Sequence, residues 1–374
     1  MSDGDTGLTQ RKPPASSAPV VSAAGIPEPH HIGTKAANFV ATTACADTTG
    51  IMAGIAGFLA PKHRLVTTAV LNNHPDQRPA RRTLLTARII DGKAIAKKLR
   101  EEYKIRVQQL ARIGVQPGLT VILVGDNPAS QVYVRNKVAA CREVGIRSQF
   151  IQLAATTSET ELLARIDDLN ADPTVHGILV QLPLPPHVEV HNVLERISVD
   201  KDVDGFHLYN VGGLVTGNTV FPPCTPYGVQ KILEHEGIDL EGKNVVVVGA
   251  SNIVGKPTAL MLMQQDATVC ICHKKTRDLA QFTLLADILI VAAGVPGLII
   301  PQMVRTGAVV IDVGINRLPD GGVIGDVDFE GVRQKASYIT PVPGGVGPMT
   351  VTMLLHNTIL STERMQTRAM RLVK

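Results

Sequence analysis

The sequence predicts an α/β protein with two α/β domains in tandem, and three observations support this. Short apolar runs bounded by Gly and Pro alternate with amphipathic segments, which is typical of βαβ units around a parallel sheet. This alternation restarts after Pro222. The chain has 374 residues, of which 44% are hydrophobic and 19% charged. It is therefore long enough for two buried cores, and a wholly disordered or collagen-like protein is excluded.

The first expected domain spans residues 86–225. A stripe of apolar residues at helical spacing runs from Ile95 to Leu110, and Gly114 ends it. Short apolar runs and helical periods then alternate along the chain. The expected strands are 120–124, 149–153 and 177–180, and the expected helices are 95–110, 129–144 and one that begins at Thr157 or Ser158.

The second expected domain spans residues 226–343 and follows a linker near 213–226. Its pattern again alternates between strands and helices. The expected strands are 244–248, 268–272, 288–292 and 309–312, and the expected helices are 226–236, 256–265 and 277–286. A last helix is expected over 349–364.

Residues 1–85 differ from the rest of the chain because no helical or strand period persists there. We interpret them as a flexible extension or as non-native residues added by an upstream start codon. The Arg-rich stretch 62–88 allows a weak transit sequence as the alternative, although scattered acids argue against it. The longest apolar stretch near the start, 51–60, is half the roughly 20 residues that a membrane span requires.

Charge and cysteine content exclude several classes of protein. The net charge is +4, and residues 1–85 hold most of it, with 8 Lys and Arg against 5 Asp and Glu. A polyanion-binding protein would carry its charge on the folded body, so no nucleic-acid partner is expected. The five cysteines form no CxxC pair, which favours free thiols in a reducing compartment. We therefore expect a cytoplasmic protein that does not bind membranes.

A glycine turn in the second domain indicates a nucleotide site. Residues 248–257 read Val-Gly-Ala-Ser-Asn-Ile-Val-Gly-Lys-Pro and join a buried strand to a helix start, the geometry that binds phosphate in a Rossmann-like domain. The alternative is a tight turn that serves packing alone. The next strand is followed by His273-Lys274-Lys275 and no carboxylate. This favours NADP over NAD as the cofactor. The alternative is that the two lysines are only solvated residues of a loop. Cys270, Cys272 and His273 could form a metal site, but buried structural thiols are favoured, so no metal is expected.

Three groups in the first domain suggest a site for a flat heterocycle. Tyr133 and Lys137 lie four residues apart and so share a helix face. Gln181 follows an expected strand directly, and the carboxyl ends of parallel strands are where such sheets bind ligands. Asp204 closes a run of three acids in five residues and could accept hydrogen bonds from ring N–H groups. A surface lysine and a half-buried tyrosine are the alternative interpretation.

A glycine-proline loop at 340–350 opens the last helix and would let the backbone approach a ligand closely. Together, four segments resemble the bifunctional methylenetetrahydrofolate dehydrogenase/methenyltetrahydrofolate cyclohydrolase family, in its bacterial form. They are Pro-Ala-Ser-Gln-Val-Tyr-Val-Arg-Asn-Lys at 128–137, Val-Gln-Leu-Pro-Leu-Pro at 180–185, Lys-Asp-Val-Asp-Gly at 201–205 and Pro-Gly-Gly-Val-Gly-Pro-Met-Thr at 343–350. The resemblance covers about residues 87–371.

The resemblance implies a cleft between the two domains in which both reactions occur, with a C-terminal helix, within 344–371, returning to the first domain. It implies NADP as cofactor, tetrahydrofolate derivatives as substrates and a homodimer. Lys137 would be the central catalytic residue, held by Gln181, with Tyr133 stacked on the folate and Asp204 at the pterin end. The implied substrate-binding set adds Val180, Leu182, Pro343, Gly344, Gly345, Val346 and Gly347. The implied NADP-binding set is Gly249, Ala250, Ser251, Val254, Gly255, Pro257, His273, Lys274 and Ile315.

Two positions depart from many members of this family, which have Arg where this chain has Ala250 and Ser where it has Lys274. A cation after His273 would then take over phosphate binding. Three alternatives stay open: a monofunctional member, another NADP-dependent two-domain dehydrogenase such as one resembling shikimate dehydrogenase, and a non-catalytic folate- or nucleotide-binding protein.

Overall fold

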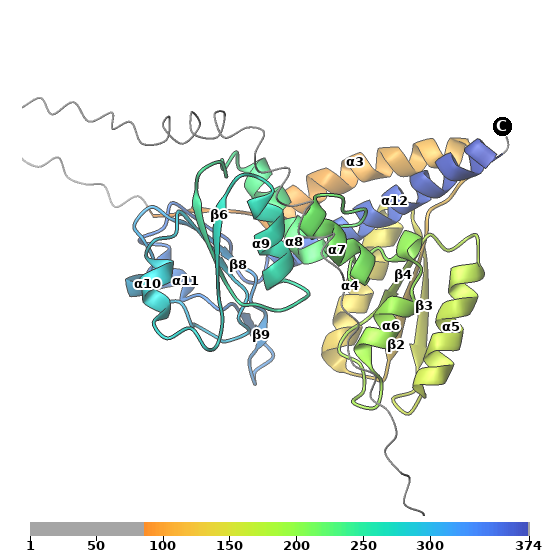
Figure 1. The fold of residues 1–374 in the computed structure, drawn as a ribbon, viewed down its shortest axis with the longest axis horizontal. Coiled ribbons are helices and arrows are strands. Elements are labelled where there is room, and N and C mark those ends of the chain that lie inside the picture. Colours follow the sequence, from red (N-terminus) through yellow and green to blue (C-terminus); the bar gives the residue numbers. More distant parts are fainter. Residues whose placement is uncertain (1–85, 373–374) are drawn as a thin grey trace, which may run out of the picture. The chain divides into compact units, whose positions relative to one another are not determined.

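The computed structural model describes residues 86–372, so the extension expected over residues 1–85 lies outside the described part. Its core consists of two parallel sheets, one of three strands and one of six, and a separate two-stranded hairpin. Helices alternate with the strands along the chain (Figure 1). The predicted fold class, two α/β units of which the second is Rossmann-like, is confirmed.

The three-stranded sheet has the order β3-β2-β4. The central strand β2 (Gly118–Val124) is buried at all seven positions, because strands pair with both of its edges and side chains cover both of its faces. This explains its unbroken apolar sequence. The other elements of this part are α4 (Pro128–Val144), β3 (Arg147–Leu153), α5 (Glu159–Ala171), β4 (Gly177–Val180), α6 (Val190–Arg196), a 3₁₀ turn (Val199–Lys201) and α7 (Leu208–Thr216).

The six-stranded sheet has the order β1-β11-β8-β7-β5-β6, with every neighbouring pair parallel. Its first strand, β1 (Arg88–Ile89), comes from the beginning of the described chain and pairs with β11 (Tyr338–Ile339). The other elements are β5 (Asn244–Val248), α9 (Gly255–Met263), β6 (Thr268–Cys272), α10 (Leu279–Thr283), β7 (Ile288–Val291), a 3₁₀ turn (Pro301–Met303), β8 (Val309–Asp312), the hairpin β9 (Asn316–Arg317) with β10 (Val323–Ile324), and α11 (Phe329–Val332).

Several boundaries differ from the sequence predictions for identifiable reasons. The helix expected over 277–286 is shortened to α10, and Asp278 fixes its start by accepting hydrogen bonds from two backbone amides of the first turn. The last helix, α12 (Val346–Leu372), extends beyond the expected 349–364 at both ends. The expected linker at 213–226 overlaps the end of α7 and the start of α8 (Cys224–His235), since Pro226 is tolerated in a first helical turn.

Helix α12 packs against two other helices, α3 (Gly92–Arg112) and α8. The long helix α3 and α12 run side by side in Figure 1. His356 of α12 lies between the rings of Tyr103 and Tyr227, with ring centroids 5.5 and 5.4 Å away. Its Nδ1 lies 3.3 Å from Nη1 of Arg106. Burial and, to a lesser extent, the nearby cations Arg106 and Lys231 together lower the pKa of His356 to about 4, so the ring is neutral at pH 7.

No helix within residues 86–372 combines the length and the apolarity that crossing a membrane would demand.

Candidate active site

Lys137 and Gln181 meet at the carboxyl edge of the three-stranded sheet. Asn127 caps α4 by accepting hydrogen bonds from Ala129 N and Ser130 N, which fixes where the helix starts and so where Lys137 lies. The backbone N–H of Gln181 continues the sheet by donating to Ile122 O at 2.8 Å. Nζ of Lys137 then donates to Oε1 of Gln181 at 3.0 Å.

The side-chain amide of Gln181 is held in one orientation. Its Nε2 donates to the carbonyl oxygen of Leu182 at 2.7 Å, so its Oε1 faces Lys137. Val180 is the buried last residue of β4, and the Leu182–Pro183 peptide bond is cis. The amide therefore acts as a fixed acceptor that orients the amine of Lys137.

Asp204 and Cys224 lie close to the amine of Lys137. Burial lowers the pKa of Lys137 from its ordinary value, and the nearby Asp204 carboxyl opposes that effect. Burial raises the pKa of Asp204, which Lys137 partly offsets. The Cys224 thiol donates to the carbonyl oxygen of Val203 at 3.3 Å, and burial raises its pKa well above the ordinary value, with the nearby Asp204 carboxyl adding to that effect. Two opposing effects therefore set the charge of the Lys137 amine. Burial favours its neutral form, and the nearby Asp204 carboxylate favours its charged form.

Two charged residues just before Asp204 in the sequence have structural roles. Asp202 accepts hydrogen bonds from the backbone N–H groups of Gly205, Phe206 and His207 and from Asn210, and these bonds shape the loop that carries Asp204. Lys201 is buried and donates to three backbone carbonyls, those of Leu169, Asn170 and Asp172. The sequence analysis missed both roles, because nothing in the sequence around Lys201 and Asp202 indicates which backbone groups their side chains bind.

A cavity of about 500 Å³ lies next to Tyr133. Its lining includes Tyr133 of α4, Ile315 and the loop residues Pro343 to Gly347, so the structure brings these expected site residues together. Burial raises the pKa of the Tyr133 phenol, with Arg317 opposing. Lys137, Gln181 and Asp204 do not line this cavity. Lys93, Arg100, Asn136 and Arg317 do, and the sequence analysis did not single them out.

Helix α3 needs glycine at its first residue, where it meets the loop beside this cavity. Lys93 N donates to Gly344 O at 3.1 Å, and Gly345 N donates to Pro341 O at 2.8 Å. A Cβ atom on Gly92 would collide with the backbone carbonyl of Gly345. The first turn of α3 and this loop are therefore in direct backbone contact.

Asp312, at the end of β8, supports the segment that carries Ile315. Its carboxylate accepts hydrogen bonds from the backbone N–H groups of Gly314, Asp326 and Val327 at 2.9 to 3.0 Å. Burial raises its pKa to about 6. Its position at a strand end was visible in the sequence, but its three backbone partners were not.

The glycine turn after β5 has the form that a phosphate site requires. Gly249 has φ +129°, and a Cβ there would collide with the Ala292 carbonyl. A Cβ on Gly255 would likewise meet the Gly249 carbonyl. Ser251 Oγ accepts from Val254 N at 3.1 Å and from Gly255 N at 3.3 Å at the start of α9. The buried Pro257 follows in the first turn, and Ala250 lies between Gly249 and Ser251.

The turn after β6 presents two cations. His273 N donates to Thr276 Oγ1 at 2.9 Å, and Lys275 N donates to His273 Nδ1 at 3.2 Å, so the turn is ordered by its own side chains. Lys274 and Lys275 are exposed. Cys272 is buried, and burial raises its pKa to about 11. Within residues 86–372, no three His, Cys, Asp or Glu side chains cluster as metal ligands would.

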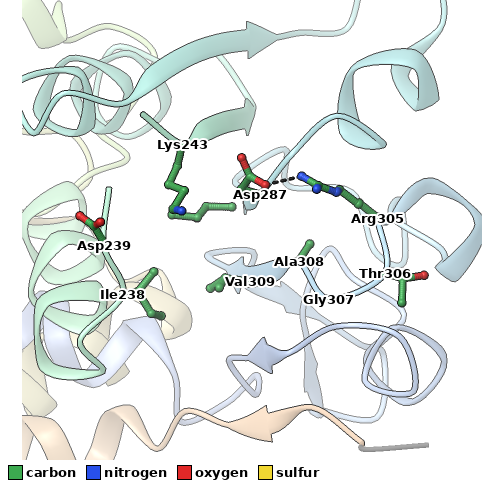
Figure 2. Close-up of a pocket in the computed structure, with 10 residues that line it drawn as sticks. Ile238, Asp239, Lys243, Asp287, Arg305, Thr306, Gly307, Ala308 and Val309 are labelled. Carbon is green, nitrogen blue, oxygen red and sulfur yellow. Dashed lines mark hydrogen bonds and ion pairs between the residues drawn. The ribbon is translucent and has the colours of Figure 1, made fainter. Parts of the chain in front are cut away.

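A second cavity, of about 250 Å³, lies at the opposite, amino edge of the six-stranded sheet (Figure 2). It is lined by residues at the starts of three strands, and an ion pair between Asp287 and Arg305 borders it. None of the expected site residues lines it. Open parallel sheets bind ligands at their carboxyl edges, whereas this cavity lies at the amino edge of its sheet.

Two family models together match most of the described chain. The family model for the tetrahydrofolate dehydrogenase/cyclohydrolase catalytic domain matches residues 90–204, and the model for the NAD(P)-binding domain of the same enzymes matches residues 223–366. The bifunctional protein FolD of Bordetella petrii is 62% identical over 278 residues, which cover 74% of this chain and 95% of that protein. The FolD protein of Nitrosospira multiformis is 59% identical and covers 76% and 99%.

Solved structures give the same result. The bifunctional FolD enzyme of Campylobacter jejuni is 55% identical with a TM-score of 0.73, over 74% of this chain and 99% of that one. The Trypanosoma brucei FolD structure, described as complexed with NADP cofactor and inhibitor, is 40% identical with a TM-score of 0.72, over 75% and 98%.

Proposed function

Because the chain belongs to the tetrahydrofolate dehydrogenase/cyclohydrolase family, we propose that its two reactions share one site in which Lys137 is the central catalytic residue. The enzyme oxidises 5,10-methylenetetrahydrofolate to 5,10-methenyltetrahydrofolate with NADP and hydrolyses that product to 10-formyltetrahydrofolate. The observation that carries the site assignment is the 3.0 Å hydrogen bond from Lys137 to Gln181, beside Asp204.

The oxidation step needs positioning more than a strong base. A C–H bond of the methylene bridge breaks, its electron pair leaves as hydride, and a nitrogen lone pair forms the C=N bond of the methenyl cation. Bound NADP⁺ supplies the acceptor for that hydride. In this proposal Tyr133 stacks on the folate and Asp204 accepts hydrogen bonds from the pterin ring. Together they hold the bridge beside Lys137.

The hydrolysis step needs an activated water. The water oxygen bonds to the methenyl carbon, its proton passes to the neutral amine of Lys137, and one C–N bond breaks as that nitrogen takes up a proton. Burial lowers the pKa of Lys137 and so increases the fraction of neutral amine near pH 7. Gln181 keeps the amine pointed at the reacting carbon.

The residues of the second half fit NADP. Gly249 and Gly255 leave backbone space that any Cβ would fill, at the start of α9, where N–H groups face outward to a phosphate. Lys274 follows β6 at the position for the ribose phosphate, and no carboxylate stands there. We accordingly assign folate binding to residues 86–225 and NADP binding to residues 226–343, with the helix within 344–371 packing back on the first part.

Both activities can be tested on one sample. Purified protein is incubated with 5,10-methylenetetrahydrofolate and NADP⁺, and the NADPH and methenyl-folate absorbances are followed, then methenyl-folate is supplied alone. We expect NADPH formation in the first assay and loss of the methenyl band in both. Oxidation without accelerated hydrolysis would identify a monofunctional enzyme and contradict the shared site.

Asp204→Asn should change the pH profile of hydrolysis in a defined direction. The Asp204 carboxylate favours the charged form of Lys137, so its removal lowers the pKa of that amine further. The acid limb of the kcat profile for hydrolysis should therefore move to lower pH, while KM for folate rises because a pterin contact is lost. Stopped-flow hydrolysis of methenyl-folate between pH 5 and 9 measures both. A limb that stays in place or moves to higher pH would contradict the role of Asp204.

We also propose that the enzyme is a cytoplasmic homodimer that pairs through the second half. The edge strand β6 and its neighbours expose large apolar side chains, among them Ile271, Phe282 and Leu285. An exposed apolar sheet edge of this kind is suited to a second copy. Sedimentation analysis should give a dimer that Ile271→Lys dissociates, whereas Ile105→Lys, an exposed site on α3, should leave it intact.

The cysteines support the cytoplasm as the compartment of the enzyme. Within residues 86–372 all four cysteines are free thiols, which suits a reducing compartment.

A further inference from the structure

Asn357 is a buried amide of α12 that neither reaction step uses directly. It is fully buried, and its Nδ2 donates to the carbonyl oxygen of Val203 at 2.9 Å and to that of Pro222 at 3.0 Å. Its Oδ1 accepts no hydrogen bond from any residue within 86–372. The hydrogen bonds of this amide are therefore directed at two backbone segments, which lie 154 and 135 residues earlier in the chain.

One of these bonds fixes the residue next to Asp204. Val203 is fully buried, and its carbonyl oxygen accepts a second hydrogen bond from Cys224 Sγ at 3.3 Å. Because a peptide unit is planar, holding the carbonyl group of Val203 also fixes where the Cα of Asp204 lies. On the other side, Gly205 N donates to the carboxylate of Asp202. The backbone is thus held both before and after Asp204.

The other bond fixes the segment on which the Asp204 loop packs. A Cβ built on Gly205 would lie 2.6 Å from the carbonyl oxygen of Phe221 and 2.8 Å from the carbonyl carbon of Pro222. The loop and the segment that leads into α8 are therefore in direct backbone contact just after Asp204. Asn357 donates to both of them, so it holds them together where they meet.

We propose that Asn357 is a positioning residue for the hydrolysis step, which acts by keeping the Asp204 carboxylate beside the amine of Lys137. It does so from α12, through its two hydrogen bonds to the loop and to the segment before α8. This inference rests on the proposed function, in which that amine is the general base. Asn357 itself touches neither substrate nor cofactor in this proposal.

The protonation of Lys137 reports where Asp204 lies. The titratable groups that face this amine are Asp204, Cys224 of α8 and Cys141 of α4, and Asp202 lies near Asp204. Burial raises the pKa of both thiols, that of Cys141 to about 12, so they stay neutral near pH 7. A carboxylate that moves away favours the charged amine less, so the pKa of Lys137 falls. The acid limb of hydrolysis then moves to lower pH, because the amine must be neutral to act as a base.

The variant Asn357→Leu tests this inference. Leucine fills a similar volume but donates no hydrogen bond, so the loop and the segment before α8 are no longer held together. We expect the acid limb of the kcat profile for methenyl-folate hydrolysis to move to lower pH, as for Asp204→Asn. KM for methenyl-folate should rise about two- to ten-fold, the effect of weakening one hydrogen bond to the substrate. Stopped-flow hydrolysis over the pH range used for Asp204→Asn measures both.

Thr358→Val is the matched control. Thr358 is equally buried and lies next to Asn357 on α12, but its Oγ1 donates to Leu354 O at 2.8 Å, within the same helix. Valine keeps the shape of threonine, so this variant removes a buried hydrogen bond of α12 that does not reach the Asp204 loop. Both the acid limb and KM should stay at the parent values. An equal shift in this control would trace the effect to loosening of the helix and overturn the inference.

The double variant Asp204→Asn/Asn357→Leu shows whether Asn357 acts through Asp204. With the carboxylate already removed, the loss of Asn357 should not move the acid limb any further. A further shift, or a folded Asn357→Leu enzyme with the parent limb and KM, overturns the inference and leaves the proposed function standing. If Asn357→Leu does not fold, Asn357→Ser, which keeps one hydroxyl donor, is measured instead and should shift the limb in the same direction. A parent enzyme that does not hydrolyse methenyl-folate would overturn the function itself.

Discussion

Lys137→Met is expected to lower the rate of methenyl-folate hydrolysis by about 10²- to 10⁴-fold, the usual contribution of a positioned general base. Methionine keeps most of the length and apolar volume of the lysine but removes the amine that Gln181 holds at 3.0 Å. NADP binding should hardly change, because Lys137 lies outside the glycine turn at Gly249. The measurements are single-turnover hydrolysis and a separate titration of NADP⁺ by calorimetry.

Arg135→Met provides the matched control for this variant. Arg135 is exposed on the same helix, two residues before Lys137, so its loss should leave hydrolysis near the parent rate. Near-normal hydrolysis by Lys137→Met would remove this residue from the mechanism. Loss of NADP binding in the same variant would point to a structural role instead.

The parent enzyme should prefer NADP⁺ to NAD⁺ by about 10- to 150-fold, and Lys274→Ala should remove most of that preference. A charge-assisted hydrogen bond to the extra phosphate is worth roughly 1.5–3 kcal/mol, which corresponds to this range. Lys274 directly follows His273, where the chain leaves β6. Hydrogen bonds of His273 with Thr276 and with Lys275 order this turn. Ala250 cannot add the second contact that an arginine there would supply.

The preference is measured as the ratio of kcat/KM for the two cofactors. Lys275→Ala is the control, since it removes the same charge one residue later and should have the smaller effect. A parent enzyme that favours NAD⁺, or a Lys274→Ala variant that keeps the full preference, would contradict this assignment of the turn.

Much of the fold could be predicted because its main strands are continuous, mostly apolar runs that can be recognised from local sequence alone. The strands at 177–180, 244–248, 268–272 and 309–312 have the expected bounds. The strands β1 and β11 were missed because two residues show no period, and the two strands pair across about 250 residues of sequence. Pairing of that kind depends on tertiary packing rather than on local propensity.

The site was predictable to the extent that its residues lie at strand ends and on one helix face. Lys137 could be singled out because it shares a helix face with Tyr133, and Gln181 because it directly follows an expected strand. Asp312 and Asn357 were not, since each is a buried polar side chain bonded to backbone far from it in the sequence. Asn357, for example, donates to Val203 O at 2.9 Å and to Pro222 O at 3.0 Å. Such bonds join segments of the chain that no sequence pattern connects.

The chain ends cross over between the two sheets, and this has a consequence for unfolding. The first strand, β1, belongs to the six-stranded sheet although α3 and the three-stranded sheet follow it. The last helix, α12, follows the six-stranded sheet, yet it packs on α3 and bonds to the backbone beside Asp204. Neither half can melt without exposing apolar surface of the other. Heat should therefore unfold residues 86–372 in one cooperative transition, where two separable domains would give two.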